Sequence, residues 1–162
     1  MNLSRFLSLP IMAVALWGGA VGDVHAAGHE LLIRSVIGGD NYCMDVAENG
    51  KENGTPVFMF RCHGRENQRW TITRGEGGQD LLVGTGGLCL DVRGRHSRAD
   101  GTPVQVWACH YGNNQRFKVG GDGRIREVES GKCLVPTQQH DAAAIVLDEC
   151  TGQPWEIWDI RH

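Results

Sequence analysis

The sequence predicts an all-β fold in which three four-stranded lobes close into a barrel. A segment with two cysteines and a closing aromatic residue occurs three times, at residues 43–70, 89–117 and 133–158. Each copy contains four short apolar runs separated by turns rich in glycine, asparagine and proline, and none shows a helical period. Closure by repetition removes exposed sheet edges, and three copies favour a three-lobed barrel over a propeller, which typically needs at least about four blades.

The N-terminal segment, residues 1–26, is predicted to be a secretory signal peptide. Arg5 supplies a positive start, residues 6–17 are mostly apolar, and small residues precede possible cleavage sites after Ala20 and after Ala26. An uncleaved membrane anchor is the alternative, but the apolar run is shorter than the roughly 20 residues that a bilayer requires. We therefore expect a secreted protein, extracellular or periplasmic, with no membrane span.

The rest of the chain, residues 30–162, is expected to form one domain. Its three copies are called repeat 1 (residues 30–73), repeat 2 (74–119) and repeat 3 (120–162), and each is expected to fold as one lobe. The net charge of -3 argues against binding to a phosphate backbone, which requires a basic face. With no nucleic-acid motif in the sequence either, no nucleic-acid partner is expected.

Four strands are expected in each repeat. In repeat 1 they lie at residues 31–35, 43–46, 57–61 and from Trp70 onward, with turns predicted at Gly38-Gly39-Asp40-Asn41 and around Asn49-Gly50, Asn53-Gly54 and Pro56. In repeats 2 and 3 they lie at residues 81–83, 89–92, 104–108, 117–119, 125–128, 133–135, 145–148 and 158–160. Gly54-Thr55-Pro56-Val57 recurs as Gly101-Thr102-Pro103-Val104, so the loop chemistry repeats as well.

All six cysteines follow the predicted signal, and an even number in an exported chain predicts disulfides. The repeat selects the pairs Cys43–Cys62, Cys89–Cys109 and Cys133–Cys150. Loops of this length are expected to contribute about 3 kcal/mol each by restricting the unfolded chain. A zinc site is the alternative, but no C-x-x-C occurs and the spacing is too wide and regular.

Each copy resembles a lobe of the ricin-type lectin domain, a β-trefoil in which a Q-x-W motif closes every lobe. The motif stands here as Gln68-Arg69-Trp70, as Gln115-Arg116-Phe117 and, altered, as Glu156-Ile157-Trp158. In all three copies the closing aromatic lies eight residues after the second cysteine. The resemblance covers residues 31–160 and implies a β-trefoil that binds galactose-type or xylan-type glycans or polysaccharides without catalysis.

The resemblance implies a principal sugar site in repeat 2. Asp91 would accept hydrogen bonds from sugar hydroxyls with help from Gln105, and Trp107 would stack on the apolar face of the sugar. Asn114 and Gln115 would complete the hydrogen bonds. The alternative is that Trp107 and Gln115 are structural, a core aromatic and a loop-fixing amide.

Repeat 1 matches the same pattern with Asp45, Phe60, Asn67 and Gln68, so a second site is expected there. Phe60 is a smaller stacking surface without an N–H donor, and Phe58 replaces the glutamine found at Gln105. We expect weaker or differently selective binding at this site.

Repeat 3 departs from the pattern at every polar position and is expected to be inactive. Val135 replaces the carboxylate, while Asp148, Trp155 and Glu156 occupy the aromatic, asparagine and glutamine positions. The cysteines and Trp158 remain, which indicates a lobe retained for folding.

The sequence carries no support for catalysis. Asp45 and Asp91 occupy equivalent positions in different repeats, too far apart to act as a glycosidase pair, and no serine lies in G-x-S-x-G. We therefore expect a secreted lectin that needs no metal or cofactor. Two alternatives remain open: a binding or delivery subunit of a multi-chain toxin, with a toxin or enzyme partner chain, and a trefoil used for protein contact or inhibition.

Overall fold

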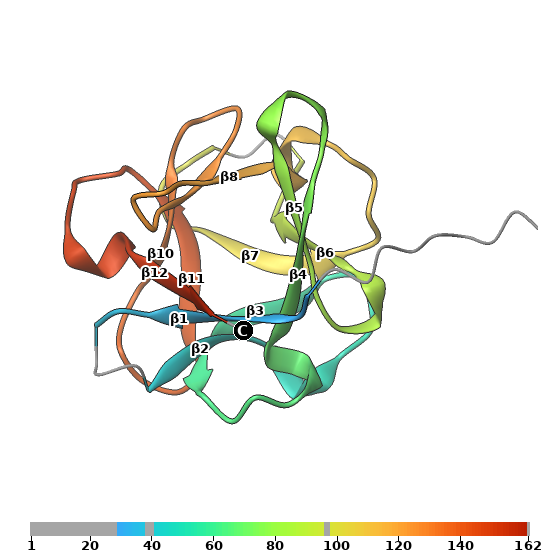
Figure 1. Ribbon diagram of the computed structural model, residues 1–162, viewed down its shortest axis with the longest axis vertical. Coiled ribbons are helices and arrows are strands. Elements are labelled where there is room, and N and C mark those ends of the chain that lie inside the picture. Colours follow the sequence, from blue (N-terminus) through green and yellow to red (C-terminus); the bar gives the residue numbers. More distant parts are fainter. Residues whose placement is uncertain (1–28, 38–40, 96–97, 162) are drawn as a thin grey trace, which may run out of the picture.

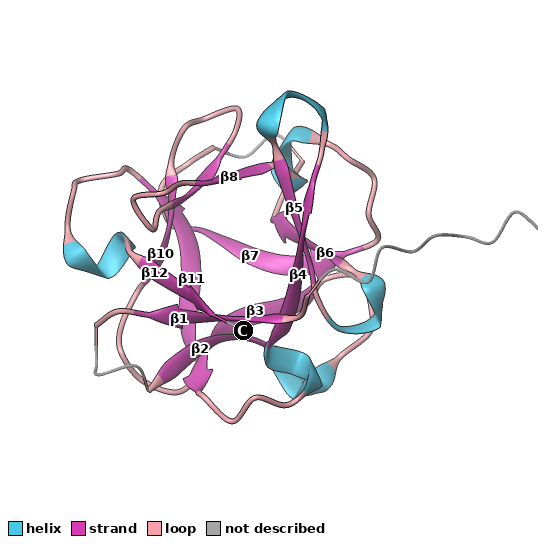
Figure 2. Cartoon of the chain, in the orientation of Figure 1, coloured by secondary structure: helices cyan, strands magenta, loops and turns pink. Residues whose placement is uncertain are grey.

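The computed structural model describes residues 29–37, 41–95 and 98–161, and strands dominate it (Figures 1 and 2). The strands are β1 (Leu31–Ser35), β2 (Tyr42–Val46), β3 (Thr55–Arg61), β4 (Arg69–Arg74), β5 (Asp80–Val83), β6 (Cys89–Val92), β7 (Thr102–Trp107), β8 (Phe117–Val119), β9 (Ile125–Glu127), β10 (Cys133–Pro136), β11 (Ala143–Asp148) and β12 (Trp158–Arg161). The described helices are single 3₁₀ turns, η1 (Ala47–Asn49), η2 (Glu66–Gln68), η3 (Glu76–Gly78), η4 (Thr85–Gly87), η5 (Asn113–Gln115) and η6 (Pro154–Glu156). The predicted signal peptide and most of the turn predicted at Gly38–Asn41 lie outside the described residues.

The strands close on themselves, as the sequence predicted. β12 pairs antiparallel with β1, placing Ile160 opposite Ile33, so the last described strand lies beside the first (Figure 1). From β1 the pairing continues through β4, β5 and β8 to β9. The predicted all-β class and its closure are confirmed.

The third strands of the three repeats also pair with one another. Met59 of β3 lies opposite Ala143 of β11, Pro103 of β7 opposite Val146 of β11, and Pro56 of β3 opposite Gln105 of β7. These contacts explain why β3 and β7 begin at Thr55 and Thr102, two residues before the expected strands. The Thr-Pro pair of each loop is part of the strand because a neighbouring repeat pairs with it.

The closing aromatics of the Q-x-W positions belong to the core. Trp70, Phe117 and Trp158 are almost completely buried. Trp70 Nε1 donates to the Met44 carbonyl at 3.1 Å, and Trp158 Nε1 donates to the Leu134 carbonyl at 3.0 Å. Phe117 has no such donor. These side chains hold each repeat together and leave the surface to other residues.

The three predicted disulfides are present. Cys43–Cys62, Cys89–Cys109 and Cys133–Cys150 each link the second strand of a repeat to the segment that follows its third strand, with Cα–Cα distances of 5.0, 5.1 and 5.2 Å. Each disulfide therefore lies at the base of the loop that carries the candidate polar residues.

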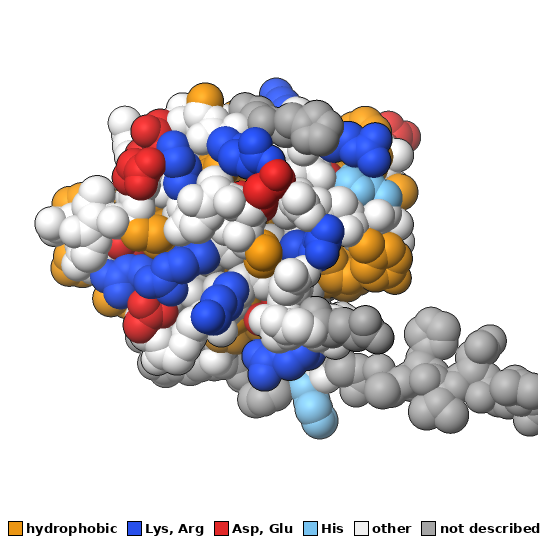
Figure 3. All heavy atoms as spheres, turned by 90° about the horizontal axis from the view of Figure 1, so that it is seen from above, with side chains coloured by type: hydrophobic (Ala, Val, Ile, Leu, Met, Phe, Trp, Pro, Cys, Tyr) orange, Lys and Arg blue, Asp and Glu red, His pale blue; other side chains and the backbone are white. Residues whose placement is uncertain are grey.

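The surface is mixed in character. Figure 3 shows Lys and Arg side chains spread over one face, with acidic and apolar groups between them. Across the described ranges, no helix has the length and apolar character needed to span a bilayer. In the same ranges no group of three or more His, Cys, Asp or Glu side chains is arranged to hold a metal ion.

Candidate functional site

A surface hollow of about 710 Å³ opens beside β6 and β7 of repeat 2. Its lining residues are Gly54, Asp91, Arg93, Gly94, Arg95, Gln105, Trp107, His110 and Asn114. The structure thus brings together four of the five residues predicted for this site, and only Gln115 is absent from the lining.

The Asp91 carboxylate organises the floor of the hollow. Its Oδ1 accepts from Gln105 Nε2 at 3.0 Å. Its Oδ2 accepts from Asn114 Nδ2 at 2.8 Å and from Gln115 Nε2 at 3.0 Å. The Asp91 side chain is only 4% exposed, so most of its accepting capacity is already used within the protein.

Gln115 lies completely beneath the surface. Besides its bond to Asp91, it donates to the Ala108 carbonyl at 3.1 Å, and its Oε1 accepts from the His110 backbone N–H at 2.8 Å. These contacts are those of a loop-fixing amide, the structural alternative for this residue. Gln68 makes the corresponding contacts in repeat 1, accepting from the backbone N–H groups of His63 and Gly64.

Trp107 is the aromatic surface of the hollow. It is the last residue of β7, and 38% of it is exposed, in contrast to the core aromatics. Repeat 1 also contributes to the lining: a Cβ on Gly54, whose φ is +89°, would lie 3.7 Å from the Trp107 ring. The neighbouring Asn53 Oδ1 accepts from the Ala108 backbone N–H at 2.6 Å and holds this turn in place.

Asn114 lines the hollow, and its amide is fixed from within the protein. Both protons of its Nδ2 are used, by Asp91 at 2.8 Å and by the Val92 carbonyl at 3.2 Å. Its Oδ1 is buried and has no hydrogen-bond partner among the described residues. A buried acceptor without a partner is unfavourable, so this atom is a local cost within the fold.

His110 also lines the hollow and is a functional candidate outside the set of residues predicted from the sequence. Its Nδ1 accepts from the Gly112 backbone N–H at 3.1 Å, which places the proton of the neutral ring on Nε2. Nε2 lies 3.4 Å from Asp91 Oδ2. The signal for it in the sequence is the repeated Cys-His at Cys62-His63 and Cys109-His110.

Repeat 1 reproduces the carboxylate–amide arrangement. Asp45 Oδ1 accepts from Asn67 Nδ2 at 2.9 Å, its Oδ2 accepts from Gln68 Nε2 at 2.8 Å, and His63 Nε2 lies 3.4 Å away. Burial raises the pKa of Asp45 above its usual value, outweighing the lowering by Gln68, Asn67 and His63.

The hollow of repeat 1, about 360 Å³, is smaller than that of repeat 2. Its lining residues are Glu48, Asn49, His63, Arg65, Glu66 and Asn67. Phe60 does not line it; its ring lies between Phe58 and His63, with centroids 6.2 and 6.0 Å away. Of the four residues predicted here, only Asn67 lines the hollow.

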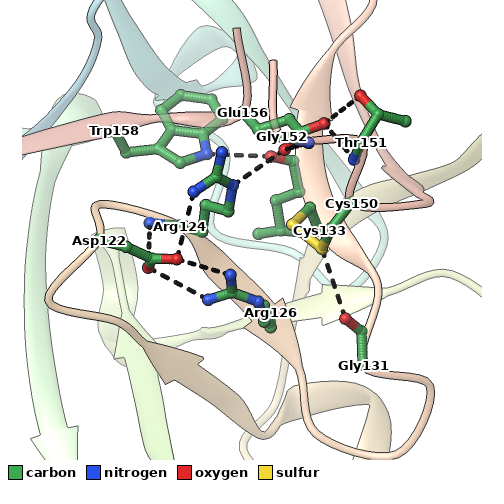
Figure 4. Close-up of polar contacts among 11 residues, drawn as sticks. Asp122, Arg124, Arg126, Gly131, Cys133, Cys150, Thr151, Gly152, Glu156 and Trp158 are labelled. Carbon is green, nitrogen blue, oxygen red and sulfur yellow. Dashed lines mark hydrogen bonds and ion pairs between the residues drawn. A yellow bond between two sulfur atoms is a disulfide. The ribbon is translucent and has the colours of Figure 1, made fainter. Parts of the chain in front are cut away.

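Repeat 3 replaces the amide network with an ion pair (Figure 4). Glu156 is fully buried and accepts from the backbone N–H groups of Thr151 and Gly152, as Gln68 accepts in repeat 1. In repeats 1 and 2 the amide N–H at this position donates to an aspartate. Glu156 has no such donor and accepts from Arg124 Nε at 2.9 Å. Burial alone would raise the pKa of Glu156, but the bonds from Thr151, Arg124 and Gly152 outweigh it and lower the pKa to about 2.

Comparison with known proteins gives two matching family profiles. The family described as ricin-type beta-trefoil lectin domain matches residues 79–162, and that described as ricin-type beta-trefoil lectin domain-like matches residues 23–107. Nigrin b of Sambucus nigra is 39% identical over 127 residues, which cover 76% of this chain and 22% of that protein. Beta-galactoside-specific lectin 3 of Viscum album is 34% identical over 92 residues, 56% of this chain and 15% of that protein. The chain thus matches less than a quarter of the length of either relative.

Among solved structures, the designed 3-fold symmetric protein ThreeFoil superposes with a TM-score of 0.76 at 25% identity, covering 82% of this chain and 98% of that one. The Rhizoctonia solani agglutinin superposes with a TM-score of 0.72 at 14% identity, covering 97% and 99% of the two chains. At that identity the second likeness concerns the fold alone.

Proposed function

Because this chain belongs to the ricin-type β-trefoil lectin domain family, we propose that it binds carbohydrate without catalysis and that its principal sugar site is the hollow of repeat 2. The observation that carries the proposal is the pairing of an exposed indole, Trp107, with the polar side chains of Asp91, Gln105 and Asn114 in one hollow. A sugar has an apolar C–H face and a rim of hydroxyls, and it needs both kinds of contact.

In the proposed complex the sugar ring stacks on Trp107 and its hydroxyls meet the polar edge of the hollow at Asn114. Asp91 and Gln105 accept or donate at the floor, and Gln115 fixes the loop from below. The side chains stand on β6, β7 and η5 next to the Cys89–Cys109 disulfide, so the site is formed before the ligand arrives. A preformed site avoids the entropy loss of ordering side chains on binding.

We further propose that the three repeats are the three four-stranded lobes of a β-trefoil. Support comes from the mutual pairing of β3, β7 and β11 and from one disulfide in each repeat. On this arrangement repeat 1 carries a second, weaker site around Asp45, Phe60, Asn67 and Gln68. Repeat 3 carries no sugar site, since Glu156 and Arg124 form an ion pair with each other.

Each site is expected to be weak alone and useful in combination. A monosaccharide of about twelve heavy atoms at roughly 0.3 kcal/mol each gives about -4 kcal/mol, a millimolar dissociation constant. Two sites on one rigid domain gain through avidity on a surface dense in glycans. We therefore propose polysaccharides or cell-surface glycans of galactose or xylan type as partners; the name beta-galactoside-specific lectin 3 supports the first.

Secretion is part of the same proposal. The three disulfides fit an oxidising compartment, extracellular or periplasmic, where such bonds persist. A toxin or enzyme partner chain remains the alternative role. It is supported by relatives such as the ribosome-inactivating protein PMRIPt of Polygonatum multiflorum, which are far longer than this chain.

A glycan array with the oxidised protein tests the proposed function. Trp107→Ala is expected to weaken binding by at least about tenfold, because the stacking surface is lost. Trp155→Ala is the matched control, since Trp155 is an equally exposed tryptophan, 43% against 38%, in repeat 3. Asp91→Asn tests the floor while keeping the side-chain volume.

Loss of one glycan class with Trp107→Ala but not with Trp155→Ala would support the site in repeat 2. Binding that survives Trp107→Ala and disappears with Phe60→Ala would move the principal site to repeat 1. A folded protein that binds no glycan would exclude the proposed function.

A further inference from the structure

We propose that the hollow of repeat 2 selects glycans carrying an acidic group, a carboxylate or a sulfate. This inference rests on the proposed function and names the ligand class of the same site. Its basis is the presence of two arginines, Arg93 and Arg95, in the lining of the hollow. They frame Gly94 directly after β6, on the same side as Trp107 and Asn114.

The two guanidinium groups are available to a ligand. Neither Arg93 nor Arg95 forms an ion pair with a described residue, and both are exposed. Arg93 Nε donates to Gln105 Oε1 at 3.3 Å, which ties this side chain to the floor of the site and leaves the four N–H bonds of its two terminal nitrogens unassigned. A guanidinium fork matches a carboxylate or sulfate with two parallel hydrogen bonds.

The acidic residue of the hollow, Asp91, is not paired with either arginine. Asp91 lies beneath the surface with its side chain 4% exposed and accepts from Gln105, Asn114 and Gln115. The rim therefore presents two positive charges although the whole chain has a net charge of -3. A neutral sugar would leave both charges unused.

Repeat 1 provides an internal comparison. Counting from Cys43 and Cys89, the positions of Arg93 and Arg95 are held there by Ala47 and Asn49. That hollow is lined instead by Glu48 and Glu66, with Arg65 as its cation. Glu66 is paired with Lys51 at 2.9 Å. An acidic sugar is therefore favoured in repeat 2 and has no matching pair of cations in repeat 1.

The test is an array in which each glycan backbone is printed in a neutral, a sulfated and a carboxylated form, for example lactose, sulfated lactose and sialylated lactose. The oxidised protein is compared with Arg93→Gln, Arg95→Gln and the double variant. Lys118→Gln on β8 is the matched control, because it removes one exposed positive charge outside the hollow.

The expected result is tighter binding to at least one acidic form than to its neutral parent. Each arginine change should reduce that advantage by about two- to fivefold, the range of an exposed ion pair, and the double variant should abolish it. The advantage should shrink as salt is raised from 0.05 to 0.5 M, since exposed charges are screened. The sulfated and carboxylated arms identify which group is recognised.

Three results overturn the inference while leaving the proposed function intact. They are equal binding of neutral and acidic forms, an acidic advantage that Lys118→Gln reduces as much as the arginine changes, and an acidic advantage that the double variant leaves unchanged. Absence of binding to every form, from folded protein, overturns the proposed function itself.

Discussion

Glu156 stands where repeats 1 and 2 carry glutamine, and this exchange of an amide for a carboxylate reorganises the polar centre of repeat 3. The backbone contacts of the loop are kept, because a carboxylate accepts from Thr151 and Gly152 as the glutamine oxygen does. The amide donor is lost, and Arg124 from the turn before β9 fills its place. Asp122 in turn binds Arg124 and Arg126, extending the network outward (Figure 4).

Glu156→Gln is expected to lower the free energy of unfolding at pH 7 by about 2–3 kcal/mol, since Arg124 loses a buried charged partner. The folded-state pKa of Glu156 is about 2, below the usual 4.5, so its contribution is complete above pH 4.5 and disappears as the pH falls toward 2. Urea unfolding of both proteins between pH 7 and pH 2 should show the two stabilities converging. A constant difference across that range would contradict the assignment.

Tyr111 has a left-handed backbone conformation, and glycine occupies the equivalent position in repeats 1 and 3. Its φ is 59°, while Gly64 and Gly152 at the equivalent positions have φ of 67° and 82°. The side chain is also 67% exposed. A large residue in this conformation is strained by roughly 1 kcal/mol or more, which points to a use other than stability.

Tyr111→Gly is therefore expected to leave the protein equally stable or more stable, by up to about 1 kcal/mol, as relief of strain offsets the freer unfolded chain. Thermal or urea unfolding measures this. Tyr111→Phe, which keeps the strain, is the control. A clear loss of stability in Tyr111→Gly alone would show that the ring makes a stabilising contact.

Sequence reasoning located the polar centre of repeat 2 but not its rim. Asp91, Gln105, Trp107 and Asn114 were placed together because the pattern in which they occur is distinctive. The sequence did not predict Arg93 and Arg95 because the residues that follow β6 differ from those at the same positions in repeat 1. No repeated pattern therefore marks them. For Gln115 the sequence left two roles open, a sugar contact and a loop-fixing amide, and its complete burial matches the second.

At the level of elements, the strands followed from apolar runs and turn residues, whereas their starting points depended on neighbours. β3 and β7 begin early because Pro56 and Pro103 lie opposite residues of other repeats. Such long-range pairing leaves no mark in a local pattern. The disulfide pairs, in contrast, followed from the repeat alone and are confirmed.

The turn between β5 and β6 depends on the absence of a side chain at Gly84. A Cβ there would lie 2.9 Å from the ring of Trp70, which is completely buried. Gly84→Ala is expected to lower the free energy of unfolding by about 1–3 kcal/mol, because the packed indole has little room to move. Gly87→Ala is a control in the same turn: its Cβ would meet no atom within 4 Å, although its φ of +72° adds strain. Equal stability of wild type and Gly84→Ala, by urea unfolding, would show that the ring can shift.

At the scale of the whole molecule, the repeats cannot be expected to unfold one by one. β1 of repeat 1 pairs with β12 of repeat 3, β4 of repeat 1 pairs with β5 of repeat 2, and one core runs through all three. We expect a single cooperative transition with the disulfides intact. Far-UV circular dichroism and tryptophan fluorescence should give the same midpoint in urea. Separate midpoints would indicate that one repeat is stable without the others.

The turn at Asn53 and Gly54 belongs to repeat 1, so the hollow of repeat 2 is formed by residues from two repeats. In a symmetric protein assembled from three copies of that repeat, Asp100 and Gly101 would take the places of Asn53 and Gly54. A carboxylate would then stand where an amide oxygen now accepts from Ala108, close to the arginine rim. The shape of the hollow therefore depends on two segments of the chain, one from each repeat, and a transplanted repeat 2 would lack one of them.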